Sequence, residues 1–488
     1  MTRRDFMAAT ALGAASVPLA RGAAGPPASY GAIPTPRQLR WHEMETYAFL
    51  HFTVNTFTDK EWGYGDEDPA IFNPTAFDAE AIMAALAAAG MTGVILTAKH
   101  HDGFCMWPTK TTGHSIRNSR WRDGKGDIVR DLSQAASLAG LGFGVYLSPW
   151  DRNNPRYGTP EYVGIYRAQL QELLTGYGPI FEVWHDGANG GDGFYGGARE
   201  KRLIDNHTYY HWPETWELVR TLSDAVIFSD VGPDIRWVGN EKGYANETCW
   251  ATFTPVGENG GPAAPGDVRT RESTTGTRNG ANWMPPECDV SIRPGWFWHA
   301  RENDRVKAAP QLLDLYFKSV GRGGSLLLNV PPDRRGVLHE NDVASLEEFG
   351  RLRLEMFASN LARGARAEAS NVRGGGIEYG PQCLIDGDRD SFWSTDDNVT
   401  TPSTVLELTE RRSFNVVRLR ENIRLGQRVE AFAIDAWRRD DWRTIAQGTS
   451  IGACRLLRTS DLVSTSRVRL RVTQSPVCPA LSEFSLFR

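Results

Sequence analysis

The sequence predicts an α/β protein in which a (β/α)8-like barrel is followed by an all-β antiparallel sandwich. Between about residue 46 and residue 330, short apolar runs alternate with segments that have apolar residues at helical spacing. Polar side chains gather at the carboxyl ends of these runs, where barrel enzymes build their sites. From about residue 366 onward, short β-rich runs and turn residues replace the helical pattern. At 488 residues the chain is long enough for two such domains.

The first 25 residues are typical of an export signal. Arg3 and Arg4 precede a short stretch rich in alanine, and small residues suited to cleavage lie between positions 20 and 26. The stretch is too short and too weakly apolar to cross a membrane, and no later segment has about 18 consecutive apolar residues. We expect residues 1–25 to be a twin-arginine-type signal. The mature protein is then soluble, without a membrane partner, and periplasmic or secreted.

Composition narrows the classes of partner. The formal net charge of −5 is small for this length and argues against nucleic acid as a partner. The 16 tryptophans have two interpretations: they fill large cores, or they provide aromatic surfaces for the apolar faces of sugars. The six cysteines have no CxxC spacing, which disfavours a zinc ribbon or a thiol redox motif. We expect few disulfides, and the sequence leaves the oligomeric state open.

The barrel prediction depends on strands and helices that alternate along one stretch of chain. Apolar strands separated by helices indicate a parallel sheet that is covered on both faces. An open doubly wound sheet is disfavoured because the chain shows no glycine-rich phosphate loop. The expected strands are residues 47–54, 92–101, 142–151, 178–187, 224–232, 289–299 and 324–332. The expected helices are residues 78–90, 127–140, 160–178, 213–222, 309–323 and 343–364.

Two domains follow from this order. We expect the catalytic barrel to span residues 30–362, closed by its last helix. The β-sandwich then occupies residues 366–488. Its expected strands, evenly spaced between turn residues, are residues 403–408, 415–422, 431–438, 442–448 and 466–474.

Asp186 is the first candidate for a reacting group. It ends the apolar run FEVW and precedes GANGGDG, so alone it reads as a turn-forming aspartate. The barrel, however, would carry His51, His100, His101 and Asp151 to the same mouth. Beside these residues at the mouth of the barrel, the Asp186 carboxylate can attack a carbon centre directly.

A second carboxylate is expected from the loop VGPDIRWVGNEKGYANE. Glu241 is our candidate, and Asp230, Asp234 and Glu247 are its competitors. Two carboxylates that flank a sugar bond are what glycoside cleavage requires. Trp296 and Trp298 lie two residues apart, so on a strand they would point to one side, either into a sugar site or into the core.

Two other interpretations compete with glycoside cleavage. The histidines could bind zinc or iron, but neighbours such as His100 and His101 would diverge on a strand, and no HxH or HExxH spacing occurs. We therefore predict no metal site. A glycan-binding protein without activity could use the same pocket, although it would have no need of both acids.

Seven segments carry a further signal, in order along the chain: residues 50–63, 96–112, 144–153, 181–190, 232–241, 293–299 and 323–336. They include KHHDGF and a W-x-DGA element. Together they resemble glycoside hydrolase family 29, the α-L-fucosidases, for which these two motifs are specific. They are similar to the branch that removes α-1,3- or α-1,4-linked fucose from branched glycans. The C-terminal region resembles a discoidin-like sandwich; such modules bind sugar or calcium or brace the catalytic domain, and we expect bracing.

This resemblance implies a reaction and a set of residues. The reaction is exo-acting, retaining hydrolysis of terminal L-fucose from oligosaccharides or glycoconjugates, without a cofactor. Asp186 corresponds to the nucleophile and Glu241 to the acid/base. The substrate-binding set is His51, Trp62, His100, His101, Trp296 and Trp298. His185 stands where many relatives have phenylalanine, which leaves the chemistry intact and puts the local packing in question.

Overall fold

The computed structural model describes residues 24–488, so nearly all of the expected export signal lies outside the described residues. The predicted fold class is confirmed. Eight parallel strands close into a barrel in the order β1-β12-β11-β8-β7-β4-β3-β2. These strands are β1 (Thr46–Leu50), β2 (Gly93–Lys99), β3 (Gly142–Leu147), β4 (Ile180–Trp184), β7 (Val226–Ser229), β8 (Ile235–Trp237), β11 (Pro286–Ser291) and β12 (Ser325–Asn329).

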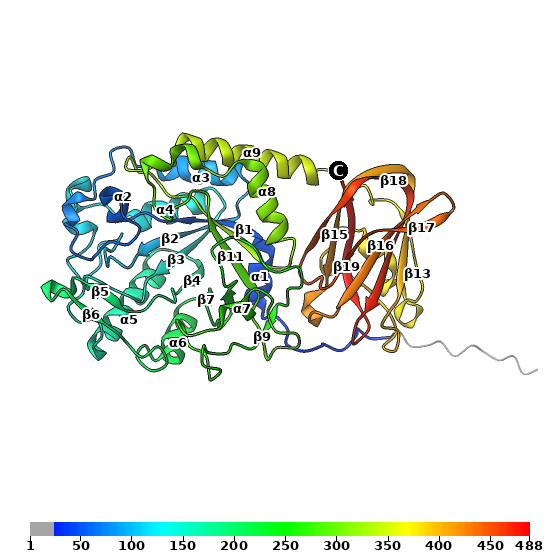
Figure 1. Ribbon diagram of the computed structural model, residues 1–488, viewed down its shortest axis with the longest axis horizontal. Coiled ribbons are helices and arrows are strands. Elements are labelled where there is room, and N and C mark those ends of the chain that lie inside the picture. Colours follow the sequence, from blue (N-terminus) through cyan, green and yellow to red (C-terminus); the bar gives the residue numbers. More distant parts are fainter. Residues whose placement is uncertain (1–23) are drawn as a thin grey trace, which may run out of the picture.

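Helices cover the outside of the barrel (Figure 1). The main ones are α3 (Ala79–Ala88), α4 (Ile128–Leu138), α5 (Pro160–Gly176), α6 (Trp212–Leu222), α8 (Ala309–Lys318) and α9 (Glu340–Phe357). Shorter elements decorate the ends: α1 (Pro36–Met44), α2 (Val54–Thr58), α7 (Thr270–Ser273), and the strand pairs β5 (Gly191–Gly193) with β6 (Glu200–Arg202) and β9 (Thr252–Phe253) with β10 (Asn282–Trp283). Within residues 24–488, no helix combines the length and the apolar character needed to cross a membrane.

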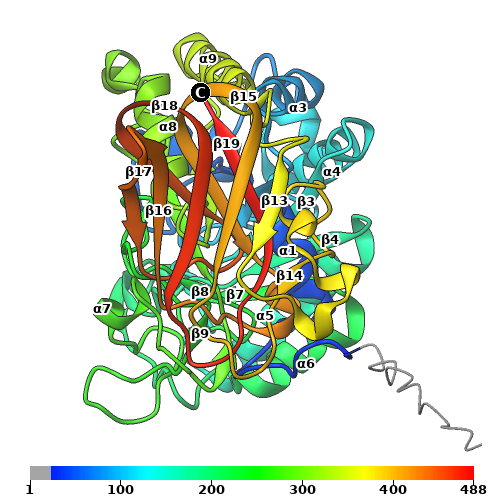
Figure 2. The same ribbon diagram turned by 90° about the vertical axis from the view of Figure 1, so that its right-hand side faces the viewer.

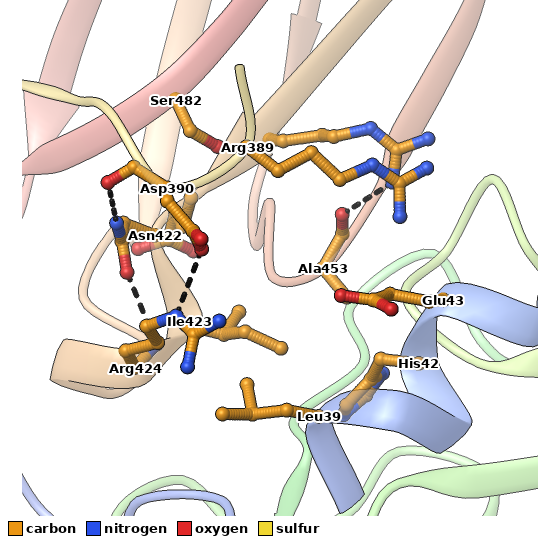
Figure 3. Close-up of a pocket in the computed structure, with 12 residues that line it drawn as sticks. Leu39, His42, Glu43, Arg389, Asp390, Asn422, Ile423, Arg424, Ala453 and Ser482 are labelled. Carbon is orange, nitrogen blue, oxygen red and sulfur yellow. Dashed lines mark hydrogen bonds and ion pairs between the residues drawn. The ribbon is translucent and has the colours of Figure 1, made fainter. Parts of the chain in front are cut away.

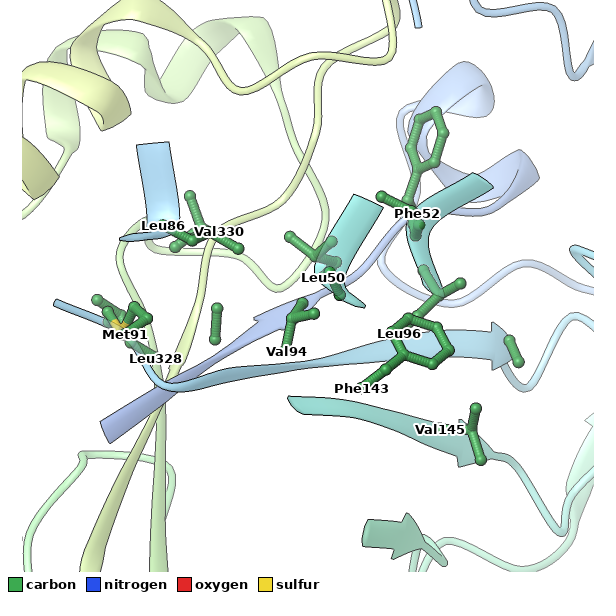
Figure 4. Close-up of a cluster of buried hydrophobic side chains, with 14 of the residues drawn as sticks. Leu50, Phe52, Leu86, Met91, Val94, Leu96, Phe143, Val145, Leu328 and Val330 are labelled. Carbon is green, nitrogen blue, oxygen red and sulfur yellow. The ribbon is translucent and has the colours of Figure 1, made fainter. Parts of the chain in front are cut away.

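The barrel strands alternate between two buried environments. Side chains such as Val94, Leu96 and Val145 pack beneath the helices, and Figure 4 shows part of this layer. Their neighbours along the strands, such as Ile95 and Tyr146, belong to a separate cluster inside the barrel. Successive side chains of a strand point to opposite faces, so each buried strand supplies both layers. The side chains on the inner face point into the barrel, so those near the carboxyl ends of the strands can line a cavity there.

The structure adds a strand that the sequence did not predict. β8 has three residues and lies inside the polar segment that we expected to be a loop. A strand this short gives too few apolar positions for a periodic signal. The connection from β8 to β11 holds α7 and the β9–β10 pair in place of a long barrel helix. Glu241 consequently lies just after β8, at the start of the long connection from β8 to β11.

The second domain is antiparallel, as predicted. It contains β13 (Arg366–Ala369), β14 (Trp393–Ser394), β15 (Ser403–Glu421), β16 (Ala431–Arg438), β17 (Asp441–Gly448), β18 (Arg455–Gln474) and β19 (Ala480–Phe487). We call it the C-terminal β domain. Its long strands β15 and β18 shift register along their length and bury a separate apolar core. Figure 2 shows this domain in front of the barrel.

Ion pairs and a small cavity mark one part of the junction between the domains. Glu45, which follows α1, binds Arg389 at 2.7 Å and Arg420 at 2.8 Å, both from the C-terminal β domain. These two guanidinium groups hold the pKa of Glu45 at about 2, against the opposing effect of burial. A cavity of about 50 Å³ lies beside them between α1 and the β domain (Figure 3).

Candidate active site

The carboxyl ends of the barrel strands surround a cavity of about 150 Å³. Seven of the eight predicted site residues line it, and Trp298 does not. The lining residues are Phe49, His51, Glu61, Trp62, His100, His101, Tyr146, Trp184, Asp186, Ala188, Glu241, Asp289 and Trp296. Residues from distant parts of the sequence thus meet in one small space.

Asp186 follows β4 and is both a turn residue and a cavity carboxylate. Its Oδ1 accepts a 2.7 Å hydrogen bond from the backbone N–H of Ala188, as in an Asx turn. Its Oδ2 accepts a 2.8 Å hydrogen bond from the hydroxyl of Tyr146. Nε2 of His101 lies 3.8 Å from the same oxygen. The two hydrogen bonds fix the orientation of the carboxylate toward the cavity.

Glu241 lies at the rim, where its side chain remains open to solvent. Nε1 of Trp296 donates to its Oε2 at 3.3 Å. Partial burial raises the pKa of Glu241, and the negative charges of Asp186 and Glu61 raise it further, against the effect of the Trp296 hydrogen bond. Glu241 therefore keeps its proton to higher pH than a free glutamate does. Asp186 and Glu241 thus lie in one cavity but in different environments.

His51 and His101 are fixed as hydrogen-bond acceptors toward the cavity. Oδ1 of Asn329 lies 2.8 Å from Nδ1 of His51, while the amide nitrogen of Asn329 donates to Ser291 and to the Trp296 carbonyl. The proton therefore lies on Nδ1 of His51, and Nε2 carries the lone pair. Ser148 Oγ donates to the Trp150 carbonyl and so accepts from Nδ1 of His101.

Burial keeps both of these imidazoles neutral. It lowers the pKa of His51 to about 3 and that of His101 to about 4. A neutral imidazole with its proton on Nδ1 presents an acceptor at Nε2. Two such acceptors beside an ionisable carboxylate are suited to binding neighbouring hydroxyl groups.

His100 and His101 do not diverge as they would on a strand. β2 ends at Lys99, and the turn after it brings both side chains to the cavity. Their ring centroids lie 4.2 Å apart, and the His100 ring also stacks on Tyr146. The strand ends one residue before this pair, so the alternation of a regular strand does not apply to it, and both histidines reach the cavity as expected.

The tryptophans have different positions. Trp62 is 53% exposed at the mouth, with its ring 5.1 Å from that of His101. The Trp296 ring lies 5.1 Å from that of His51. Trp298 was expected to share a strand face with Trp296. The strand β11 ends at Ser291, so strand alternation does not apply to either residue. The indole nitrogen of Trp298 is buried without a hydrogen-bond partner.

Six lining residues were not predicted, and strand alternation could have found several of them. Trp184 lies two residues before Asp186, and Tyr146 lies inside β3, so both point into the barrel. The position of Glu61, which lies in a loop, depends on its bonds to the backbone N–H of Trp296 and to His299. Phe49 and Ala188 complete the apolar part of the wall.

Asp289 is a fourth carboxyl group in the cavity, beside Asp186, Glu241 and Glu61, and was also missed. Its Oδ1 accepts a 2.7 Å hydrogen bond from Nε1 of Trp237. Burial raises its pKa well above the usual range, and the charge of Glu241 adds to this effect. Asp289 therefore keeps its proton to higher pH than a free aspartate does. Asp289 lies two residues after the buried Glu287 on β11, so both side chains point to the same face of the strand. This alternation could have identified Asp289 from the sequence.

The competing carboxylates lie outside the cavity lining. Asp234 forms an ion pair with Arg220 at 2.7 Å. Glu247 is exposed on the outer part of the loop. Asp230 is buried against the turn after Asp186, where it accepts from the backbone N–H of Gly266, and burial raises its pKa to about 7. Asp151 binds the backbone of its own turn and lies 3.5 Å from Lys99.

His185 points away from the cavity. Its Nδ1 lies 2.7 Å from the hydroxyl of Tyr166, its ring packs near Trp212, and its Nε2 has no partner. Burial lowers its pKa to about 3. A neutral imidazole thus occupies this position in the layer behind the strand.

Among residues 24–488, no cluster of three or more His, Cys, Asp or Glu side chains is arranged to hold a metal ion. All six cysteines are buried and unpaired.

The chain is similar to known α-L-fucosidases. The Alpha-L-fucosidase family model matches residues 29–353. Alpha-L-fucosidase 1 of Arabidopsis thaliana is 43% identical over 461 residues, which cover 93% of this chain and 87% of that protein. A putative alpha-L-fucosidase 1 of Oryza sativa subsp. japonica is 42% identical over 466 residues, covering 95% and 86%.

Solved structures resemble the chain over nearly its whole length. The structure of a putative alpha-L-fucosidase from Bacteroides thetaiotaomicron has a TM-score of 0.85 at 37% identity, covering 95% of this chain and 99% of that one. A Ruminococcus gnavus GH29 fucosidase in complex with fucose has a TM-score of 0.84 at 32% identity, covering 95% and 96%.

Proposed function

The chain belongs to the α-L-fucosidase family, glycoside hydrolase family 29, and from this premise we propose how its cavity cleaves a fucosidic bond. Its activity is that of an α-L-fucosidase. The proposal is exo-acting, retaining hydrolysis through a covalent fucosyl-enzyme. The observation that carries it is the pair of acids in one cavity: Asp186, oriented by Tyr146 and Ala188, and Glu241, with a raised pKa.

In the first step, a carboxylate oxygen of Asp186 forms a bond to the anomeric carbon. The bond from that carbon to the leaving oxygen breaks, and Glu241 gives this oxygen its proton. In the second step, Glu241 takes a proton from water while the water oxygen bonds to the anomeric carbon. The bond to Asp186 then breaks, and fucose leaves with its original configuration. Two inversions at one carbon give net retention.

The remaining cavity residues bind the sugar. Nε2 of His51 and Nε2 of His101 accept hydrogen bonds from its hydroxyl groups, and His100 lies between them. Phe49 and Trp184 present apolar surface to its C–H groups and methyl group. The small volume of the cavity supports the binding of one terminal residue. Trp62 and Glu241 at the open mouth face the remainder of the glycan.

For the substrate, we propose terminal α-1,3- or α-1,4-linked L-fucose on oligosaccharides or glycoconjugates. The support is the resemblance of the motifs, including LSPWD at residues 147–151, to that branch of the family. We also propose that residues 1–25 export the protein to the periplasm or beyond, on the basis of the paired arginines and the apolar stretch after them.

One assay tests the proposed reaction and the proposed substrate together. The purified protein is incubated with fucosylated oligosaccharides of α-1,2, α-1,3, α-1,4 and α-1,6 linkage, and free fucose is measured. We expect release from the α-1,3 and α-1,4 substrates. Proton NMR at early times should show α-fucose first; β-fucose first would overturn retention. Binding of the oligosaccharides without release would favour a glycan-binding protein.

A further inference from the structure

Glu241 has few contacts of its own. Its hydrogen bond from Trp296 is long, and the side chains of Glu241 and Lys242 are exposed. Gly239 and Gly243, which flank them, have positive φ, where other residues are strained. The position of the Glu241 carboxyl therefore depends on how the rest of its loop, residues 238–251, is held. We call these residues the acid loop.

The middle of the acid loop is attached to the barrel. The N–H of Ala245 donates to the carbonyl of Lys318, at the end of α8, at 3.0 Å. Nη1 of Arg322 donates to the carbonyl of Ala245 at 2.5 Å. A side chain at Gly243 would meet Val290 of β11 at 2.6 Å, so the backbone lies against the barrel at this point. The turn after α8 is thus one support of the loop.

The far end of the acid loop is attached to the C-terminal β domain. Gln427 holds it on two sides: its Oε1 accepts from the N–H of Ala251 at 2.8 Å, and its Nε2 donates to the carbonyl of Cys249 at 3.0 Å. Oγ of Ser450 accepts from the N–H of Cys249 at 2.9 Å. One glutamine amide thus pairs with the loop backbone as a neighbouring strand would.

Two further residues of the β domain extend this attachment. The hydroxyls of Thr449 and Thr248 lie 2.8 Å apart. Arg455, the first residue of β18, donates to the carbonyl of Glu247. Gln427, Ser450 and Arg455 are buried, at 6%, 2% and 4% exposure. Hydrogen bonds in such surroundings are strong, and their loss leaves buried backbone groups without partners.

The β domain also supports the turn that holds the middle of the loop. The N–H of Leu456 in β18 donates to the carbonyl of Gly321 at 2.9 Å, and Arg322 pairs with Arg455 as an isolated antiparallel bridge. Both supports of the acid loop therefore end on the first residues of β18 and the loops beside it. The barrel alone supplies neither the Gln427 amide nor this bridge.

We infer that the C-terminal β domain positions the acid/base: Gln427, with Ser450 and Arg455, holds the acid loop so that the Glu241 carboxyl faces the leaving oxygen. Gln427 is a positioning residue, since it lies on another domain and acts through the loop. The inference rests on the proposed role of Glu241. It gives the β domain a part in the reaction beyond bracing the barrel.

The test compares two fucosides that differ in their need for a proton. The chloronitrophenolate of an aryl α-L-fucoside is a good leaving group and departs without protonation. The leaving sugar oxygen of a fucosylated oligosaccharide needs a proton from the acid. In the full-length Gln427→Ala variant, we expect kcat/KM for the oligosaccharide to fall about tenfold, a part of the roughly 100-fold or more that general acid catalysis supplies. For the aryl fucoside, kcat/KM, which reports the first step, should change less than about twofold.

A matched control separates positioning from general stability. Arg389→Gln removes an ion pair at the same domain junction, on the α1 side shown in Figure 3, where the Arg389 guanidinium binds Glu45 and not the acid loop. It should leave the ratio of the two kcat/KM values unchanged, even at an equal loss of melting temperature. Ser450→Ala is a milder second variant should Gln427→Ala fold poorly, and it should move the ratio in the same direction.

The outcomes distinguish this inference from the proposed role of Glu241. If Glu241→Ala lowers the two kcat/KM values equally, Glu241 is not the acid. If Glu241→Ala is selective for the oligosaccharide but Gln427→Ala and Ser450→Ala lower both substrates alike, Glu241 keeps its role and the positioning inference is overturned. An unchanged ratio in both β-domain variants overturns it as well.

Discussion

The hydroxyl of Tyr146 donates a 2.8 Å hydrogen bond to Oδ2 of Asp186, joining the third strand of the barrel to the turn after the fourth. Tyr146 is buried, and burial raises its pKa well above the usual range, an effect that the Asp186 carboxylate strengthens. Tyr146 therefore remains protonated and acts only as a donor at neutral pH. The relationship makes the orientation of Asp186 depend on a residue 40 positions away.

Tyr146→Phe should lower kcat/KM for an aryl fucoside about tenfold. The substitution keeps the ring in place and removes a hydrogen bond to a charged group, worth about 1.5–3 kcal/mol. Steady-state kinetics measure the effect. Tyr157→Phe is the control, because Tyr157 is also a buried tyrosine but does not line the cavity. Equal activity of both variants would show that Asp186 does not need this donor.

Asp186→Ala should abolish turnover of the aryl fucoside, with a loss of about 1,000-fold or more, because no other group can form the covalent bond. Asp192→Ala, which removes an exposed aspartate of β5, should retain activity. Substantial residual turnover by the Asp186→Ala protein, after the wild-type enzyme is excluded as a contaminant, would remove Asp186 from the role of nucleophile.

Glu241→Ala should reduce kcat/KM for fucosylated oligosaccharides by about 100-fold or more, and for a chloronitrophenyl fucoside much less. The difference arises because only the oligosaccharide oxygen needs a proton to leave. Glu247→Ala is the matched control, since this exposed glutamate belongs to the same loop and lies outside the cavity. Losses of equal size on both substrates would count against an acid role for Glu241.

Glu61→Gln should move the basic limb of the pH profile to lower pH. Burial raises the pKa of Glu241, and the charge of Glu61 contributes to the rise. The first step needs protonated Glu241, so kcat/KM for an oligosaccharide falls as pH rises through this pKa. Removing one negative charge lowers the pKa and brings the fall to lower pH.

The profile of kcat/KM against pH measures this shift. Asp59→Asn is its control, because Asp59 also binds His299, at 2.6 Å, but does not line the cavity. A basic limb that stays in place in the Glu61→Gln variant would mean that Glu61 does not act on Glu241 through its charge.

His185→Phe should make the protein more tolerant of acid. The pKa of His185 is lowered by burial from 6.5 to about 3, so the unfolded chain binds more protons between these values. Stability from the neutral imidazole is complete above pH 6.5 and is lost as pH falls toward 3. At pH 5, this loss amounts to about 2 kcal/mol.

Melting temperatures of the wild type and the His185→Phe variant at pH 8 and pH 5 measure the effect. The variant should lose less on acidification than the wild type, by a few degrees. A drop of the same size in both proteins would show that His185 does not titrate on unfolding in this range.

The rule that residues after parallel strands share one mouth placed His51, His100, His101 and Asp186 in the site. Strand alternation was not applied to Tyr146 and Trp184, although both lie on inner faces of their strands and a period of two is visible there. Alternation fails where regular strands end. His100 and His101 both reach the cavity because β2 has already ended, and Trp298 does not reach it because β11 has.

The sequence by itself determined the barrel, the antiparallel domain after it and most of the residues that meet at the barrel mouth. The two domains follow from local periodicity, and most of the site residues follow from the rule that parallel strands bring their carboxyl ends together. Trp62 and the choice of Glu241 among its competitors came from the resemblance of the motifs to the family. Only the tertiary structure decided the protonation of Glu241 and Asp289, the acceptor faces of His51 and His101, and the attachment of residues 247–251 to Gln427 and Ser450. Burial and contacts between groups far apart in the chain set these properties, and no local pattern encodes them.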